Sequence, residues 1–535
     1  MIDFMSSVAD LIVSRLRDAG VSTIFGVPGG GSNLDLIAAA GHASLPFVLT
    51  STETGGALAA AAQAEVTGRP AACLTTLGPG VASVVNGIAH AFLDRVPVVV
   101  FTDSHPDAFA HQRLDHRALL APVTKWSVKL TAEGAADTLD RALAIAIAPP
   151  AGPVHVDCPG DVLSVEISTR SAGAELAPPD GFPAAEPGGP TELGPYIARA
   201  RKPLLIVGLG ARGVQDPPAI CGFCERLSVP AMVTYKAKGV VPDDHPLFAG
   251  VFTNATLEQP LIAECDLLIG LGLDPVELIP RAWRRERPIV YLGPFAVETR
   301  HVPFAAQRVD TIAAGVAYLE SYLRRSDWRI DRVQAAVRDQ RRRVAGSDDG
   351  FTAQAVVRVA ADRLASSVRV TVDAGAHMFP ATTFWPACRP ADMLISNGLS
   401  TMGFALPAAI GAALVDRGRP VVGLTGDGGL LMSAGELLTA VRERLHVVVI
   451  VFSDSSLSLI EVKQQQRRFD ASGVALGTIR WPALAESFGA ASSCATSETE
   501  LTRCLDQAMS HRGPTLVEAR IDRSNYSRML AAIRG

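Results

Sequence analysis

Short apolar runs alternate with longer amphipathic stretches along most of the chain. Clear examples of the runs are "VPVVVFTD", "KPLLIVGLG", "CDLLIGLG", "RPVVGLTGDG" and "HVVVIVFSD". Apolar runs of strand length, separated by helical patterns, are typical of parallel sheets that carry helices on both faces. The pattern therefore predicts an α/β protein built from doubly wound parallel sheets.

Two breaks divide this pattern into three segments of comparable size. Residues 171–195 are rich in Pro, Gly and Ala without apolar periodicity, which predicts an interdomain linker. The second break, at 332–350, is an Arg-rich helix followed by "GSDDG". Because 535 residues exceed what one hydrophobic core can hold, we expect about three domains, and the first and third segments look like similar units.

Charge and composition narrow the class of protein. The formal net charge is -5, with acids and bases interspersed, which gives no electrostatic footprint for nucleic acid or a membrane surface. Small anionic or neutral substrates fit better. The N-terminus reads as an amphipathic helix and not as a signal peptide, and no apolar run reaches about 18 residues. We therefore expect a cytoplasmic protein.

The cysteines and one glycine motif have plain structural interpretations. Cys221 and Cys224 form a lone CxxC, which we interpret as packing on one helix face because no second CxxC completes a zinc site. Gly208, Gly210 and Gly213 have GxGxxG spacing after an apolar run. The next predicted strand ends in Tyr-Lys and not in the acid that a dinucleotide fold needs, so we interpret the motif as a tight turn.

Two aspartates follow two predicted strands of the third segment. One strand ends at Gly426-Asp427-Gly428 and the next at Asp454, and we expect Ser433 and Glu436 to form a capping box for the helix between them. A right-handed crossover brings the carboxyl ends of parallel strands to one edge of the sheet. Asp427 and Asp454 should therefore face one point.

Two carboxylates at one point predict a site for Mg²⁺, which typically takes one or two carboxylates together with phosphate oxygens. The glycines beside Asp427 allow backbone amides to approach those phosphates. The sequence thus favours a cradle for magnesium and a diphosphate. The alternative is that Asp454 only caps the following helix and Asp427 lies in a turn.

The stretch resembles the thiamine diphosphate motif, which begins with GDG and ends in two asparagines. The second asparagine falls on Asp454 and the first on Ser453, so Ser453-Asp454 departs from the pattern. The resemblance implies Asp427, Asp454 and the carbonyl of Ser456 as metal ligands. It further implies that the cofactor is bound by Gly426, Asp427, Gly428, Gly429, Asp454 and Ser456.

Further stretches resemble the acetolactate synthase and 2-oxo acid decarboxylase superfamily: "FGVPGG", "TTLGPGVASVVNGIAHAFLDRVPVVVFTD", "GPVHVDCPGDV" and "NGLSTMGFALPAAIGAAL". The resemblance implies a pyrimidine-binding domain at 1–170, a middle domain at 191–330 and a diphosphate-binding domain at 351–535. It also implies a homodimer or homotetramer in which the active site is shared between subunits.

By the same resemblance, Glu53 is the catalytic glutamate that hydrogen-bonds the cofactor's pyrimidine ring. The sequence alone allows another interpretation, in which Thr50 and Glu53 form a capping box for the Ala-rich helix. Met402 matches the bulky residue that props the bent cofactor. The resemblance also implies diphosphate contacts by Gly375, Ala376 and His377, and we place His111 and Gln112 near the substrate.

The implied reaction is that of a decarboxylase and carboligase of the acetolactate synthase type, acting on pyruvate or a similar 2-oxo acid. The double-histidine motif of pyruvate decarboxylases is missing from "SHPDAFAHQRLDH", and the middle segment lacks the Asp-rich stretch of FAD-binding acetolactate synthases, so we do not expect FAD. The alternatives are a lyase that cleaves a 2-hydroxy ketone or acyl substrate, an inactive regulatory subunit, and a nicotinamide dehydrogenase.

Overall fold

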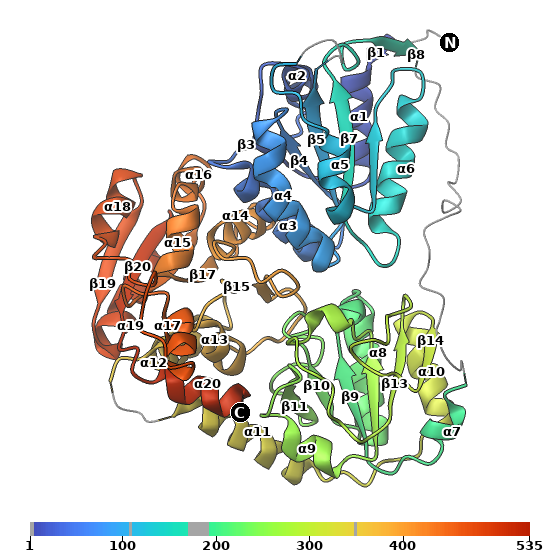
Figure 1. The fold of residues 1–535 in the computed structure, drawn as a ribbon, viewed down its shortest axis with the longest axis vertical. Coiled ribbons are helices and arrows are strands. Elements are labelled where there is room, and N and C mark those ends of the chain that lie inside the picture. The colour runs from blue at the N-terminus through green and yellow to red at the C-terminus, as the bar shows by residue number, and fades with distance from the viewer. Residues whose placement is uncertain (1–4, 106–109, 169–191, 347–349, 535) are drawn as a thin grey trace.

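Three six-stranded sheets, all of them parallel, form the centres of three domains in the computed structural model (Figure 1). The structure describes residues 5–105, 110–168, 192–346 and 350–534. Helices pack on both faces of each sheet, so the predicted doubly wound α/β architecture is confirmed. Most of the predicted linker at 171–195 lies outside the described residues.

The first sheet has the strand order β3-β2-β4-β5-β7-β6. Buried side chains of α1, α2 and α6 share a core with one face, and those of α3 and α4 share a core with the other. A short antiparallel pair, β1 and β8, lies beside this sheet. The elements are β1 (Met5–Ser7), α1 (Val8–Asp18), β2 (Ile24–Val27), α2 (Asn33–His42), β3 (Phe47–Leu49), α3 (Glu53–Thr67), β4 (Ala71–Thr75), α4 (Pro79–Leu93), β5 (Val98–Ser104), α5 (His116–Leu120), η1 (Ala121–Val123), β6 (Trp126–Lys129), α6 (Ala135–Ile147), β7 (Val154–Pro159) and β8 (Glu166–Ser168).

The third sheet has the order β16-β15-β17-β18-β20-β19. When the strands are numbered within each domain, the first and third sheets both run 2-1-3-4-6-5, so the expected similarity of these domains is confirmed. The elements are α12 (Ala353–Leu364), β15 (Arg369–Val372), α13 (Met378–Phe384), β16 (Met393–Ile395), α14 (Ala405–Val415), β17 (Val421–Gly426), α15 (Asp427–Ser433), α16 (Glu436–Arg442), β18 (Val447–Ser453), α17 (Ser458–Gln466), α18 (Trp481–Ser487), β19 (Ala491–Ala495), α19 (Glu498–Ser510), β20 (Thr515–Arg520) and α20 (Tyr526–Arg534).

The middle sheet runs β11-β10-β9-β12-β13-β14, which is the 3-2-1-4-5-6 order of dinucleotide-binding folds. Cys224 is buried in its core and Cys221 packs against that core, as predicted, and both thiols are free. The elements are α7 (Gly194–Ile197), β9 (Pro203–Val207), η2 (Leu209–Ala211), α8 (Asp216–Leu227), β10 (Ala231–Val233), β11 (Phe248–Val251), α9 (Gln259–Glu264), β12 (Leu267–Leu271), η3 (Pro275–Glu277), β13 (Ile289–Gly293), β14 (Ala306–Val309) and α10 (Ile312–Tyr322).

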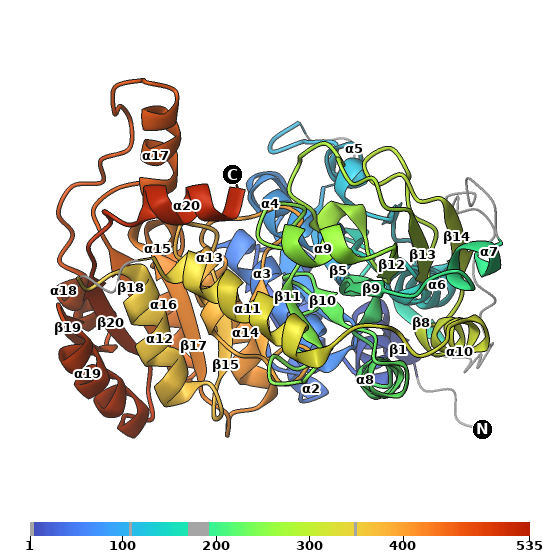
Figure 2. The same ribbon diagram turned by 90° about the horizontal axis from the view of Figure 1, so that it is seen from below.

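The Arg-rich helix α11 (Ile330–Ala345) joins the middle and third domains rather than separating them. Val333 and Ala336 pack in a core of the middle domain, whereas Val344 packs in the core of the third. Figure 2 shows the helix running from one domain to the other. Among the helices that the structure describes, none is long and apolar enough to cross a membrane.

Close packing of α3 against α14 fixes the first domain on the third. Leu58 and Ala62 of α3 belong to the core that α14 forms. A Cβ on Gly411 of α14 would lie 2.0 Å from the carbonyl oxygen of Ala59, so only glycine allows this approach. The contact holds the direction of α3, and therefore the place of Glu53, its first residue.

Candidate functional site

The structure brings Asp427 and Asp454 together at the carboxyl edge of the third sheet. Asp427 Oδ2 accepts hydrogen bonds from the backbone N–H groups of Ser455 (2.6 Å) and Asp454 (3.2 Å). Its Oδ1 accepts from the N–H of Gly428 at 2.8 Å. The buried side chain of Asp427 therefore holds in place the turn that carries Asp454.

Asp454 supports the start of the next helix. Its Oδ1 accepts from the N–H of Ser456 (3.1 Å) and its Oδ2 from the hydroxyl of Ser458 (2.7 Å). Burial raises the pKa of Asp454 to about 6, opposed by the Ser458 hydrogen bond and reinforced by the charge of Asp427. Burial also raises the pKa of Asp427. A divalent cation at this edge would favour both ionised forms, so the donor set fits a metal.

A cavity of about 350 Å³ lies beside these carboxylates. Its lining includes most of the cofactor-binding residues that the sequence predicted, namely Gly375, Ala376, His377, Met402, Gly426, Asp427, Gly428, Gly429, Asp454 and Ser456. A Cβ on Gly428 would lie 2.6 Å from Leu457 Cδ2 and 3.4 Å from Met402 Cε. A side chain at 428 would therefore crowd Leu457, and Met402 lies close to the same glycine.

His377 lines this cavity. The ring is buried and stacks on Phe452, with centroids 4.9 Å apart. Burial lowers the pKa of His377 to about 4, so the imidazole is neutral at pH 7. Its Nε2 is buried without a hydrogen-bond partner among the described residues. The ring therefore borders the cavity as a neutral group, and the expected diphosphate contact stays a prediction.

Asp373 fixes part of the backbone around the same cavity, although the sequence analysis did not single it out. It follows β15 and accepts hydrogen bonds from the N–H groups of Gly403 (3.0 Å) and Phe404 (3.3 Å) and from the Thr425 hydroxyl (2.8 Å). Burial raises the pKa of Asp373 to about 6. These bonds fix the backbone directly after Met402. The available signal was an acid at the end of a strand, the same signal that marked Asp427.

Glu53 lies at the start of α3 and is not part of the predicted capping box. The N-cap is Thr52, whose Oγ1 accepts from the N–H of Gly55 at 2.9 Å, whereas the Thr50 hydroxyl donates to the carbonyl of Thr52. The alternative interpretation of Glu53 as a capping residue is therefore wrong. Its Oε1 lies 3.3 Å from where a Cβ on Gly80 would be, and within the described chain no hydrogen bond engages the carboxylate.

The capping box predicted for Ser433 and Glu436 is also wrong. Helix α16 begins at Glu436 with Gly435 as its N-cap, and no side chain caps it. The Glu436 carboxylate instead accepts from the N–H groups of Ser51 and Thr52, each at 3.1 Å. These amides of the first domain take the place of a capping partner, and the buried carboxylate also accepts from the Thr439 hydroxyl of its own helix at 2.8 Å.

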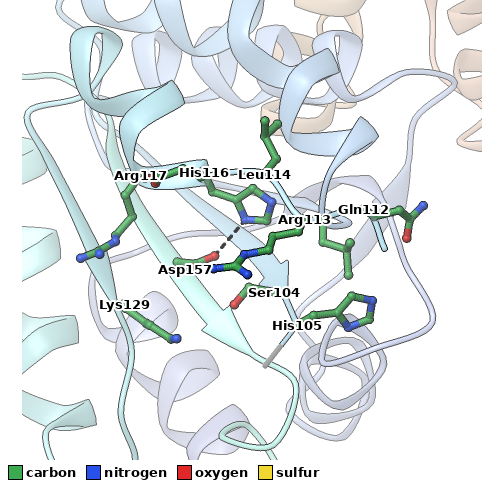
Figure 3. A pocket seen from close by; sticks show the side chains of 11 residues that line it. Ser104, His105, Gln112, Arg113, Leu114, His116, Arg117, Lys129 and Asp157 are labelled. Atoms are coloured by element: carbon green, nitrogen blue, oxygen red, sulfur yellow. Dashed lines mark hydrogen bonds and ion pairs between the residues drawn. The ribbon is translucent and has the colours of Figure 1, made fainter. Parts of the chain in front are cut away.

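Gln112 packs against Gly78, two residues before the Gly80 that approaches Glu53. His111 does not share a pocket with Gln112. A Cβ on Gly78 would lie 3.0 Å from the carbonyl oxygen of Gln112. Gln112 borders a hollow of about 240 Å³ at the carboxyl edge of the first sheet (Figure 3). His111 is exposed and does not line this hollow.

The GxGxxG turn of the middle domain is filled by the protein itself. The N–H of Leu209 donates to Glu277 Oε2 at 2.9 Å, and the hydroxyl of Thr234 donates to Oε1. A Cβ on Gly208 would lie 2.5 Å from Leu273 Cα. Glu277 therefore takes the place where a dinucleotide fold holds a phosphate, which supports the interpretation as a structural turn.

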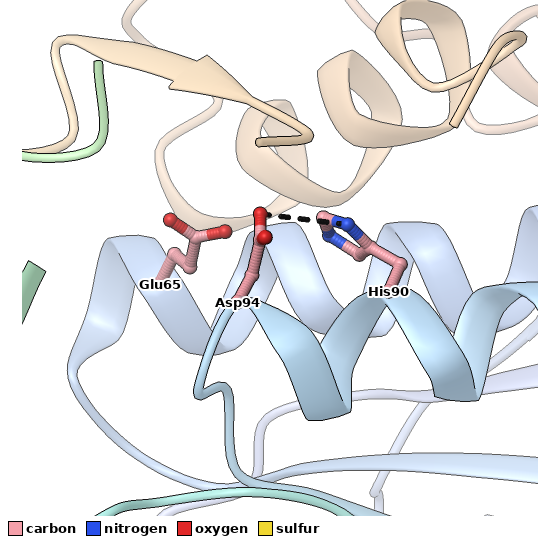
Figure 4. A group of neighbouring side chains, drawn as sticks. All are labelled: Glu65, His90 and Asp94. Carbon is pink, nitrogen blue, oxygen red and sulfur yellow. Dashed lines mark ion pairs between the residues drawn. The ribbon is translucent and has the colours of Figure 1, made fainter. Parts of the chain in front are cut away.

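Glu65, His90 and Asp94 form a second group of metal-ligand type between the domains (Figure 4). The chain supplies its own cation there, since Lys236 Nζ lies 2.6 Å from Glu65 Oε1 and 3.0 Å from Asp94 Oδ2. Asp94 also accepts from the N–H groups of Asn397 (3.2 Å) and Gly398 (2.6 Å). The cluster thus ties all three domains to the segment that leads to Met402.

Comparison with known proteins agrees with this geometry. Thiamine pyrophosphate enzyme models match in three parts: the N-terminal TPP binding domain at 6–121, the central domain at 191–309 and the C-terminal TPP binding domain at 373–519. The acetolactate synthase of Bacillus subtilis (strain 168) is 30% identical, with 97% of this chain and 93% of the relative covered.

Two further relatives are similar at the same level. The catabolic acetolactate synthase of Raoultella terrigena is 30% identical over 96% of this chain and 95% of the relative. A probable 2-ketoarginine decarboxylase of Pseudomonas aeruginosa is 30% identical over 95% of this chain and 93% of the relative. The three matching domains and these relatives show that the chain belongs to the thiamine pyrophosphate enzymes, in the branch that is similar to acetolactate synthase.

Proposed function

We propose that the protein is a Mg²⁺- and thiamine diphosphate-dependent enzyme that decarboxylates a 2-oxo acid, pyruvate or a similar one, and joins the remaining fragment to a second carbonyl. The proposal depends mainly on one observation: Asp427 and Asp454 lie together at a cavity that Met402 also lines. The proposal includes a cytoplasmic location and no requirement for FAD.

The bound cofactor would supply a nucleophilic carbon that attacks the substrate carbonyl, and a cationic ring that accepts the electron pair released when the adjacent bond breaks. Asp427, Asp454 and the carbonyl of Ser456 would hold Mg²⁺. His377 and the backbone of 426–429 would contact the diphosphate, with Gly375 and Ala376 beside them. Met402 would press on the cofactor from the opposite wall, where Asp373 fixes the backbone.

Glu53 would hold a proton at its carboxylate, shared with a ring nitrogen of the cofactor. Its carboxylate has no competing hydrogen bond within the described chain, which leaves it open to such a partner. Glu53→Gln should keep cofactor affinity but slow exchange of the thiazolium proton by about 10²–10⁴-fold, as for a lost acid–base group. Exchange at the wild-type rate in this variant, followed by NMR, would overturn the role.

The reaction is tested by a screen of 2-oxo acids for carbon dioxide release, with and without acceptor aldehydes and without FAD. We expect carbon dioxide together with a hydroxyketone. Carbon dioxide with free aldehyde as the sole second product would support the proposed decarboxylation and contradict the proposed ligation. Cleavage of a 2-hydroxy ketone in the same assay would favour the lyase, and no turnover at all would favour an inactive subunit.

We propose a homodimer or homotetramer in which Glu53 and the 426–456 cradle of one active site come from different subunits. Mixing the Glu53→Gln and Asp427→Ala variants should then restore part of the activity, because one kind of site in the mixed dimer is intact. A fully active monomer in analytical ultracentrifugation would refute this arrangement.

A further inference from the structure

The hollow beside Gln112 is lined by basic side chains that have no role in the proposed reaction. It lies at the carboxyl edge of the first sheet, where β5 ends at Ser104, β6 ends at Lys129 and β7 carries Asp157. Its volume is about 240 Å³, enough for a small group and not for a nucleotide. The remaining lining residues are Leu77, His105, Gln112, Arg113, Leu114, Asp115, His116 and Arg117.

Hydrogen bonds hold Asp157 in place at the floor of the hollow. Asp157 accepts hydrogen bonds from His116 Nδ1 (3.2 Å) and from the Thr102 hydroxyl (3.0 Å). His116 Nε2 in turn accepts from the N–H of Gly78 at 3.1 Å, so the imidazole proton is on Nδ1. The other acid of the lining, Asp115, caps α5 by accepting from the N–H of Ala118 at 2.9 Å.

The rim is cationic. Figure 3 shows Arg117 and Lys129 on one side of the hollow, Arg113 across its centre and His105 on the opposite side. Within the part of the chain that the structure describes, no ion pair engages the guanidinium groups of Arg113 and Arg117. Guanidinium groups bind oxyanions through paired N–H donors, and the basic lining residues Arg113, Arg117 and Lys129 outnumber the acidic ones, Asp115 and Asp157.

The hollow and the reacting centre lie on two sides of one short turn. Gly78 is bonded to the floor through His116, and Gly80 is the glycine whose Cβ would approach Glu53 Oε1 to 3.3 Å. Two residues of chain span at most about 7 Å. The cofactor ring that Glu53 would bind therefore lies close to the turn that borders the hollow, and an extended substrate held on that cofactor is in reach of the hollow.

We propose that this hollow binds a distal oxyanion of the 2-oxo acid substrate, so that the preferred donor carries a second acidic group. Arg113 and Arg117 contribute the charge, and Gln112 borders the hollow beside the Gly78 turn. The inference rests on the proposed function, because it names the substrate class of the same site. It disfavours a cationic side chain such as that of a 2-oxo acid with a guanidinium group.

The kinetic test compares 2-oxoglutarate and 2-oxoadipate with 2-oxopentanoate and 2-oxohexanoate as sources of carbon dioxide. Wild-type kcat/KM should favour the diacids by about tenfold or more, the scale of one charge-assisted hydrogen bond. Arg113→Gln should reduce this ratio, and the double variant with Arg117→Gln should bring it close to one. Arg17→Gln, an exposed arginine on α1, is the matched control and should leave the ratio unchanged.

A binding test separates the inference from the reaction. Calorimetry on the Glu53→Gln protein, loaded with thiamine diphosphate and Mg²⁺, should show 2-oxoglutarate binding more tightly than 2-oxopentanoate. The double arginine variant should lose this difference. Equal affinities, or a difference that survives in the double variant, would overturn the inference even if both acids release carbon dioxide.

Two further outcomes complete the test. If no 2-oxo acid releases carbon dioxide but the calorimetric difference holds, the proposed reaction fails and the anion site stands. If inorganic phosphate changes the turnover of 2-oxopentanoate in the wild type but not in the double arginine variant, and does not compete with 2-oxoglutarate, the hollow binds a free effector and the substrate assignment is wrong.

Discussion

Carboxylates converge both at the 427–454 edge and at the Glu65–Asp94 contact, but the two places balance their charge differently. At the contact, Lys236 places an ammonium within 3.0 Å of both carboxylates, and Arg212 adds a second cation 2.7 Å from Glu65. At the edge, Asp427 and Asp454 accept hydrogen bonds from backbone N–H groups and a serine hydroxyl. A pair of carboxylates therefore indicates a metal only where the chain itself supplies no cation.

The pKa shifts follow this difference. Although burial alone would raise it, the Lys236 ammonium and His90 hold the pKa of Asp94 below its ordinary value. Burial raises the pKa of Asp454 to about 6, because hydrogen bonds do not offset the loss of solvent. One cluster is electrostatically complete and serves the fold, whereas the other gains from a cation and suits a binding role.

Lys236→Met should have the largest effect on stability, because it leaves Glu65 and Asp94 buried without their central cation. We expect a loss of about 3–5 kcal/mol in the free energy of unfolding, measured in urea. Lys202→Met is the matched control: its ion pair with Glu264 is partly exposed and should contribute about 1 kcal/mol or less. Similar losses for the two variants would show that Lys236 does not stabilise the buried carboxylates of Glu65 and Asp94 as a central cation.

Asp454→Asn should change how stability depends on pH in cofactor-free protein. Between pH 4 and 6, folded Asp454 holds a proton that the unfolded chain, with an ordinary pKa near 3.8, has lost. The free energy of unfolding should therefore fall as pH rises through this window, by about 2 kcal/mol from this group. Asn cannot titrate, so urea unfolding of the variant should show a shallower fall. Identical slopes would contradict the raised pKa.

Ser456→Ala should have the smallest effect, because the proposed metal ligand is the carbonyl of this residue and not its hydroxyl. The variant loses one hydrogen bond to Glu461 (2.6 Å) and about 1 kcal/mol of stability. Cofactor affinity should stay within about threefold, which corresponds to about 0.7 kcal/mol of binding free energy. A loss of cofactor as large as that caused by Asp427→Ala would move the ligand role to the side chain.

The sequence predicted the parts that depend on strand periodicity. Apolar runs located β17 and β18, and chain topology then brought Asp427 and Asp454 to one edge. It could not predict partners that are distant along the chain: Lys236 meets Glu65 across 171 positions, and Glu436 meets Ser51 across 385. The capping box predicted for Ser433 and Glu436 failed for this reason, because local spacing does not show which tertiary amides compete for a carboxylate. The box predicted for Thr50 and Glu53 failed locally, because Thr52 is the N-cap of α3.

The central claim is that the 427–454 edge needs an external divalent cation, whereas the Glu65–Asp94 contact does not. The most direct measurement is calorimetric titration of thiamine diphosphate into wild-type and Asp427→Ala protein, each with Mg²⁺ and with excess chelator. We expect tight binding only in the wild type with Mg²⁺, and urea stability without cofactor that is unchanged by chelator. Tight binding by Asp427→Ala in chelator, or unfolding of the cofactor-free wild type on chelation, would contradict the account.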